Sequence, residues 1–133
     1  MQLQLIRSIA RRLELREAVG DEIEKEGFDL VYQSVFEDGE FRNFSIIFKL
    51  TLTMAKKSAL IVEYVSNFET DSEFAEDFKT SHFIEKNAPA IAFPFIRSYV
   101  AHITLIGGYE TVILPSVNFT VPNDGVLKNL KVS

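Results

Sequence analysis

The chain has 133 residues, 47% of them hydrophobic and 25% charged, which is the composition of one globular domain. Its 14 basic and 19 acidic residues give a net charge of -5, and this excludes a general nucleic-acid binder, which needs clustered cations. The absence of cysteine excludes a disulfide framework and thiolate metal sites.

The N-terminal segment does not resemble a secretory signal, because Arg7, Arg11 and Arg12 interrupt its apolar positions. The chain has no run of about 18 or more apolar residues, so no transmembrane helix is expected. We therefore expect a cytoplasmic protein that does not insert into the membrane. The mean hydropathy of +0.07 is high for a small soluble monomer, and it predicts that another chain covers part of the apolar surface.

Residues 3–15 carry apolar side chains mainly at odd positions and polar ones at even positions. A period of two predicts a half-buried strand, and a helix is the alternative because these residue types also tolerate one. Residues 17–27 are acidic and contain Gly20 and Gly27. They predict a connection rather than a long element.

Three further strands are predicted over residues 28–36, 41–54 and 58–67, each with alternating or continuous apolar side chains. An acidic, glycine-containing turn at residues 37–40 separates the first two. The third is apolar on both faces apart from Glu63, which predicts that something covers each side of it.

Residues 68–85 change character and predict a short amphipathic helix. Phe74 and Phe78 are four residues apart, with acidic residues around them. Thr70, Asp71 or Ser72 is suited to the N-cap, and the acidic first turn suits the helix dipole.

A second helix is predicted with Asn87 as its N-cap and Pro89 near its first turn, where the missing N–H is tolerated. Pro94 predicts either a kink in this helix or its true start. The pair Gly107 and Gly108 predicts its end, because glycine accepts the left-handed conformation found there.

Residues 109–119 form an unusually apolar extended arm, in which Pro115 argues against a fully paired central strand. From the pattern alone, this arm is equally suited to packing on its own core, or on a sister subunit, and to lining a groove for extended apolar peptide. Residues 120–133 are polar and predict a flexible tail.

No constellation for catalysis is evident. His82 and His102 are far apart without a metal-ligand pattern, and the sequence lacks a nucleophile elbow, a phosphate-binding glycine loop and a zinc-protease motif. Glu63 is the one carboxylate within an apolar strand. The simplest interpretation is that its side chain points outward into solvent. We therefore expect no enzyme activity, no metal and no cofactor.

Several segments resemble the SecB export-chaperone family, and the resemblance covers most of the chain. They correspond to five features of the family, in the same order and with similar spacing. These features are a helix motif, a glycine that ends the helix before an aromatic residue, the end of the arm, and two strands. These segments are residues 93–97 (FPFIR), Gly107 with Tyr109, residues 116–119 (SVNF), residues 48–54 (FKLTLTM) and residues 59–68 (ALIVEYVSNF).

This resemblance implies an α+β fold over residues 1–133, with a four-stranded antiparallel sheet, two main helices and an extended crossover arm. Family members are homotetramers, built as dimers of dimers. They hold unfolded polypeptide clients in hydrophobic grooves without ATP, and in protein export they pass preproteins to the SecA motor.

The resemblance also implies site residues. Six side chains from the fourth strand and the arm would bind peptide: Leu60, Val62, Tyr64, Tyr109, Val112 and Leu114. On the opposite face of the sheet, Ile61 and Glu63 would be the SecA contacts.

Three departures from the family pattern bear on its partners. Arg12 and Arg16 stand where the first strand would carry acidic residues for SecA, Pro115 is one place early, and the tail lacks an apolar C-terminal helix. These departures argue against SecA docking more than against peptide holding. A dedicated chaperone of a toxin–antitoxin system, or another single-client module, is the alternative. A third hypothesis is a small-ligand protein or enzyme, for which the polar groups Tyr32, Glu63 and Tyr64 are available.

Overall fold

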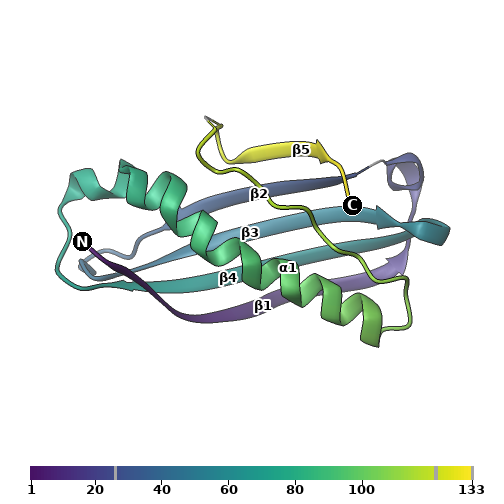
Figure 1. Ribbon diagram of the computed structural model, residues 1–133, viewed down its shortest axis with the longest axis horizontal. Helices are drawn as coiled ribbons and strands as arrows, with labels where there is room; N and C mark the ends of the chain where they lie inside the picture. The colour runs from purple at the N-terminus through teal and green to yellow at the C-terminus, as the bar shows by residue number, and fades with distance from the viewer. Residues whose placement is uncertain (26, 122, 133) are drawn as a thin grey trace.

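The computed structural model describes residues 1–25, 27–121 and 123–132 of the chain. The protein forms an antiparallel sheet. One long helix, α1, and the extended arm of residues 109–119 lie across the same face of this sheet (Figure 1). We call this covered side the inner face and the opposite side the outer face. The α+β class predicted from the sequence is confirmed, and the number of elements differs.

The sheet has five strands in the order β1-β4-β3-β2-β5. Their bounds are β1 Leu3–Glu17, β2 Phe28–Val35, β3 Asn43–Met54, β4 Ser58–Thr70 and β5 Val126–Leu130. The four predicted strands are present close to their predicted positions, and β5 was not predicted. The connection after β1 contains a short 3-10 turn, η1 (Gly20–Glu24), and carries the chain past β4 and β3 to β2.

Two bulges in β1 explain its irregular apolar pattern. The register against β4 shifts between Leu5 and Arg7 and again between Ala10 and Arg12. Each extra residue reverses which parity faces the core, because side chains alternate along a strand. Ile9 therefore lies on the outer face opposite Val65, although the sequence grouped it with the other odd-numbered apolar residues.

The core lies between the inner face of β3 and β4 and the helix and arm that cover it. Alternate residues of both strands, from Phe44 to Met54 and from Leu60 to Phe68, are buried and paired across the two strands. Phe44 and Phe68 stack with ring centroids 5.1 Å apart. Such paired apolar side chains are the main source of stability in a sheet.

The prediction of a helix over residues 68–85 is wrong. β4 continues to Thr70, and the next regular structure is a 3-10 turn, η3 (Glu76–Thr80). Phe74 and Phe78 are four residues apart because both fold back onto Phe44, with ring centroids 6.5 and 6.3 Å away. Aromatic packing, and not helical periodicity, accounts for their spacing.

A π-helical turn, η4 (Phe83–Asn87), runs directly into α1 (Ala88–Ile106). Asn87 is therefore helical and makes no capping hydrogen bond, contrary to the prediction. Pro89 lies in the first turn of α1 as predicted, and Pro94 lies inside the helix. The predicted end is confirmed, with Gly108 taking the left-handed conformation at φ 85°.

The helical segment Phe83–Ile106 is long and apolar enough, by length and composition, to cross a membrane. The core helix of a soluble protein passes the same test. Here Ala92, Ile96 and Val100 are buried on the side of α1 that faces the sheet. We therefore interpret the segment as a helix that packs on the sheet.

The tail expected to be flexible contains β5, which pairs with β2 at the edge of the sheet (Figure 1). The remaining tail residues have no regular structure, and Pro122 and Ser133 lie outside the described residues. The tail thus supplies a strand where we expected only loop.

Candidate functional site

The three predicted peptide-binding residues of β4 all face the covered side of the sheet. Leu60, Val62 and Tyr64 are only 0, 1 and 8% exposed. They belong to the same hydrophobic cluster as the buried residues of α1 and the arm. Tyr64 also packs against Tyr99 of the helix, with ring centroids 5.4 Å apart.

The arm presents every second side chain to this cluster. Val112 and Leu114 are buried, and Tyr109 is partly buried where the arm leaves the helix. Phe119 lies at the C-terminal end of the arm, and its ring centroid is 5.3 Å from that of Tyr32. The structure thus brings all six predicted peptide-binding residues into one cluster, three from β4 beneath the cover of helix and arm and three from the arm itself.

Two side chains of α1 hold the arm by hydrogen bonds to backbone groups of the arm. The buried hydroxyl of Thr104 accepts from the Val112 N–H at 3.0 Å and donates to the Val100 carbonyl at 2.8 Å. Arg97 Nε donates to the Leu114 carbonyl at 2.6 Å. No strand of the described sheet pairs with the arm. It is therefore attached by apolar packing and a few polar contacts, without a backbone ladder.

Thr104 and Arg97 were not predicted as site residues. Thr104 is four residues after Val100 on the buried side of α1, so it is a polar residue at a core position. Buried hydroxyls almost always have a partner, and this signal could have identified it. The partner of Arg97, a backbone carbonyl, leaves no trace in the sequence.

The outer face of the sheet carries the two residues predicted to contact SecA. Ile61 is partly buried and Glu63 pairs with Arg11 of β1. The hydrogen bond from Arg11 is the main reason that the pKa of Glu63 lies below its ordinary value. Glu63 is thus a paired carboxylate next to basic side chains, and nothing marks it as catalytic.

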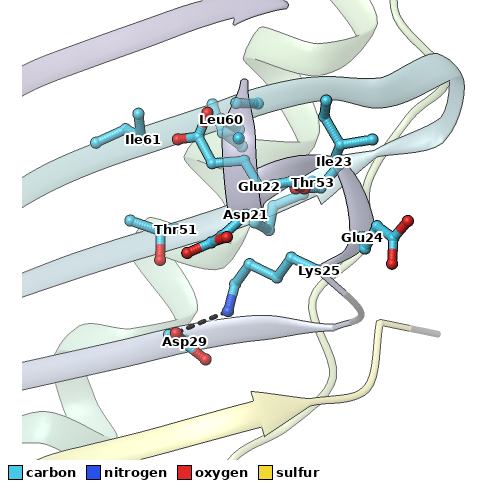
Figure 2. Close-up of a pocket in the computed structure, with 13 residues that line it drawn as sticks. Asp21, Glu22, Ile23, Glu24, Lys25, Asp29, Thr51, Thr53, Leu60 and Ile61 are labelled. Atoms are coloured by element: carbon cyan, nitrogen blue, oxygen red, sulfur yellow. Dashed lines mark hydrogen bonds and ion pairs between the residues drawn. The ribbon is translucent and has the colours of Figure 1, made fainter. Parts of the chain in front are cut away.

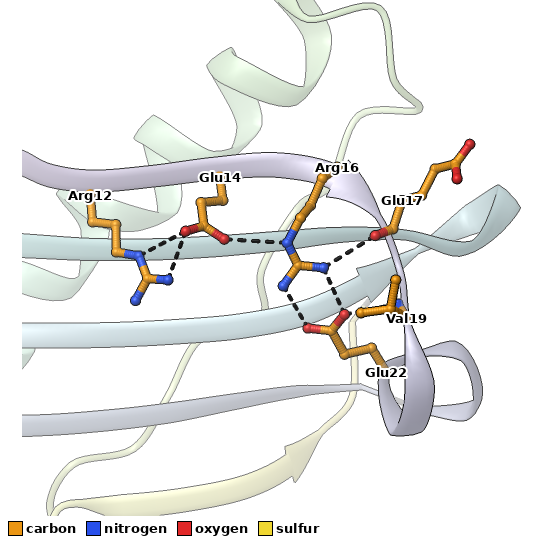
Figure 3. A network of polar contacts seen from close by, with 6 residues as sticks. All are labelled: Arg12, Glu14, Arg16, Glu17, Val19 and Glu22. Atoms are coloured by element: carbon orange, nitrogen blue, oxygen red, sulfur yellow. Dashed lines mark hydrogen bonds and ion pairs between the residues drawn. The ribbon is translucent and has the colours of Figure 1, made fainter.

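A chain of ion pairs extends along the outer face of β1 (Figure 3). Glu14 pairs with both Arg12 and Arg16, at 2.7 and 3.3 Å. Arg16 then reaches Glu22 of η1 with two hydrogen bonds of 2.7 and 2.9 Å. The hydrogen bonds from Arg16, followed by that from the Val19 N–H, lower the pKa of Glu22 to about 2. Of the two arginines that stand where acids were expected, Arg16 ties β1 to the following turn, while Arg12 pairs with Glu14 within the strand.

A hollow of about 650 Å³ lies between η1 and the outer face of the sheet (Figure 2). Its lining includes Asp21, Thr51 and the ion pair between Lys25 and Asp29, whose atoms are 2.7 Å apart. The hydroxyl of Thr53, another lining residue, donates to the Glu22 backbone carbonyl at 2.6 Å. Within the described ranges, no cluster of three or more His, Cys, Asp or Glu could hold a metal ion.

The family model of SecB, described as preprotein translocase subunit SecB, matches residues 28–121. Among solved structures, the chain is similar to Mycobacterium tuberculosis Rv1957, a SecB-like chaperone in complex with a ChAD peptide from the Rv1956 HigA1 antitoxin. That match has 13% identity and a TM-score of 0.61, and it covers 87% of this chain and 88% of the other.

A protein of unknown function from Streptococcus agalactiae is also similar, with 17% identity and a TM-score of 0.50, over 86% of this chain and 98% of that one. No curated protein matches the chain in sequence. At such low identities, the two structural similarities show the fold alone.

Thr104→Val tests the attachment of the arm. Valine keeps the shape of the side chain and leaves the buried Val112 N–H without an acceptor, so we expect a loss of about 1–3 kcal/mol of unfolding free energy. Urea unfolding measures this loss. Thr104→Ser keeps the hydroxyl and should retain slow exchange of the Val112 amide hydrogen. Equal behaviour of the valine and serine variants in both measurements would show that the hydrogen bond does not hold the arm.

The Glu22 carboxyl should stay ionised at pH values well below the usual pKa of a glutamate. A folded-state pKa below the ordinary 4.5 contributes stability above about pH 4.5, and this contribution is lost as the pH falls toward 2. NMR titration of the Glu22 side-chain carboxyl measures this pKa directly. Arg16→Gln removes the main cause and should raise the pKa toward its ordinary value. A wild-type midpoint near 4.5 would contradict the interaction.

Proposed function

Since the chain belongs to the SecB family, whose model spans residues 28–121, we propose that it is an ATP-independent holding chaperone of the cytoplasm without enzyme activity. Its clients would be unfolded or extended apolar polypeptides. The observation that carries the proposal is the arm, an extended apolar segment that covers the inner face without a backbone ladder. A client segment of similar character can replace it with the same kind of contact.

The exchange costs little free energy, because the client buries apolar surface in place of the surface that the arm gives up. Burial contributes about 25 cal/mol per Å² and depends little on the order of side chains, so many client sequences are suitable. Among the hydrogen bonds recorded for the described residues, those that the arm loses on leaving include the ones with Thr104 and Arg97. In this proposal Leu60, Val62 and Tyr64 bind the client from the sheet, and Tyr109, Val112 and Leu114 bind it from the displaced arm.

A dedicated role with one client is the second form of the proposal. It is supported by the similarity to Rv1957, which was solved with a peptide of an antitoxin. A pull-down dominated by one client, together with weak general holding, would favour it.

Transfer of preproteins to SecA is the less favoured form. Arg12 and Arg16 occupy the outer face of β1, and their charges are committed to Glu14 and Glu22. In this form Ile61 and Glu63 would contact SecA. Measuring SecA binding and client binding on the same preparation separates holding from export.

We further propose that the chain forms a homo-oligomer, built as a dimer of dimers. Four large apolar side chains on the open side of α1 are 40–81% exposed: Ile91, Phe95, Leu105 and Ile106. β1 is an edge strand of 15 residues, which offers unpaired backbone groups to another copy. An exposed apolar patch together with a long edge strand is typical of a subunit interface.

Holding is tested with the purified protein and a chemically unfolded client in the absence of nucleotide. Wild-type protein should suppress client aggregation at about one oligomer per client chain. Leu114→Asp places a charge at the fully buried centre of the arm and should weaken client binding more than it lowers stability. Ile113→Asp, at the neighbouring and 42% exposed position, is the matched control. No suppression by the wild type would end the proposal, and equal losses of stability and holding in Leu114→Asp would assign the arm to the core alone.

The oligomer is tested by Phe95→Asp, since a charge on the open side of α1 should prevent association there. We expect a fall in the mass measured by light scattering with an unchanged circular dichroism spectrum. Thr111→Asp, exposed on the arm, should leave the mass unchanged. A wild-type protein that is monomeric at micromolar concentration would contradict the proposal.

A further inference from the structure

β5 pairs with β2 in an irregular way. The pairs are Phe28 with Leu130, Leu30 with Leu127 and Val31 with Val126, so β5 contains one extra residue between the first two pairs. Asn129 accommodates it with a positive φ of 55°, which costs energy for a residue other than glycine. Its N–H donates to the Asp29 side chain at 3.0 Å instead of to a strand carbonyl. The ladder is therefore interrupted near its middle.

β5 also buries little surface for a strand. Leu127 and Leu130 are partly buried against the core, and Val126 is 40% exposed. By contrast, β2 pairs with β3 along all eight of its residues. Elements with few buried apolar contacts and interrupted hydrogen bonding are the first to detach from a native structure. β5 can therefore leave β2 while the rest of the sheet stays folded.

Detachment of β5 would produce a binding site for an extended chain. It would free the edge of β2 next to Phe28 and Leu30, which are both fully buried in the core. The edge also continues past β5, because β2 runs to Val35 while the hydrogen bonds between the described tail and β2 reach only to Tyr32, whose N–H donates to the Gly125 carbonyl at 2.9 Å and whose hydroxyl donates to Asn123 at 2.7 Å. A hollow of about 420 Å³ adjoins this part, between β2, η4 and the end of the arm, and its lining mixes apolar side chains such as Ile84 with charged ones such as Lys86. An open strand edge beside an apolar surface, here the one that Leu127 and Leu130 now cover, is the arrangement used for strand addition.

We propose that the edge of β2 is a strand-addition site for an extended apolar segment of a client, and that β5 occupies this site as an internal substitute. The proposal rests on the holding function proposed above. The client segment pairs with β2 in place of β5 and inserts alternate apolar side chains where Leu127 and Leu130 now pack. Because β2 is longer than the part that β5 covers, a client forms a longer and unbulged ladder than the tail does.

A reversible lock on β5 tests this competition. Val31 and Val126 are directly paired and exposed, and directly paired antiparallel residues have Cα atoms about 4.5–5.5 Å apart, within the range of a disulfide. The chain has no cysteine of its own, so Val31→Cys with Val126→Cys gives a single disulfide. The oxidised protein should bind a carboxymethylated, permanently unfolded client about tenfold more weakly than the same protein after reduction, because the competent state is no longer populated.

Gln4→Cys with Glu69→Cys is the matched control, since these exposed, paired residues lock the opposite edge of the sheet. Its client affinity should not depend on oxidation. Equal client affinity of the oxidised and reduced β2–β5 pair would overturn strand addition and leave the holding function intact. Failure of the wild type and of both reduced variants to hold the client would contradict the holding function itself, and strand addition with it.

Discussion

Burial of the inner face of β3 and β4 is the interaction on which the rest of this structure depends. The two strands pair along their whole length and present one continuous apolar surface. Its side chains are almost fully buried, and both the helix and the arm pack on them. The arm follows Gly108, and the aromatic residues of the turn after β4 cover one end.

The two kinds of cover differ in how firmly they are attached. α1 satisfies its own backbone and packs through a row of side chains four residues apart. The arm has no such internal hydrogen bonding and relies on Thr104, Arg97 and its alternating apolar residues. A structure that covers an apolar face with a removable segment is suited to holding other extended chains. The proposed exchange of β5 at the edge of β2 extends the same reasoning to the tail that follows the arm.

The sequence predicted the strands well because period-two patterns directly reflect one covered face. It failed where long-range contacts decided the structure. The spacing of Phe74 and Phe78 resembled a helix, although both residues fold back onto Phe44. The bulges of β1 and the pairing of β5 depend on neighbouring strands and leave no local pattern. At the candidate site, the family resemblance supplied the side chains of β4 and the arm, while the attachment through a helix hydroxyl to a backbone amide became evident only from the structure.

The central claim is that clients bind where the arm now lies. Hydrogen exchange of the Val112 amide, bonded to Thr104 at 3.0 Å, reports directly on the arm. If clients displace the arm, exchange at Val112 accelerates when a saturating, permanently unfolded client is added, while the amides of β3 remain protected. Unchanged or slower exchange at Val112, with the client demonstrably bound, would contradict it.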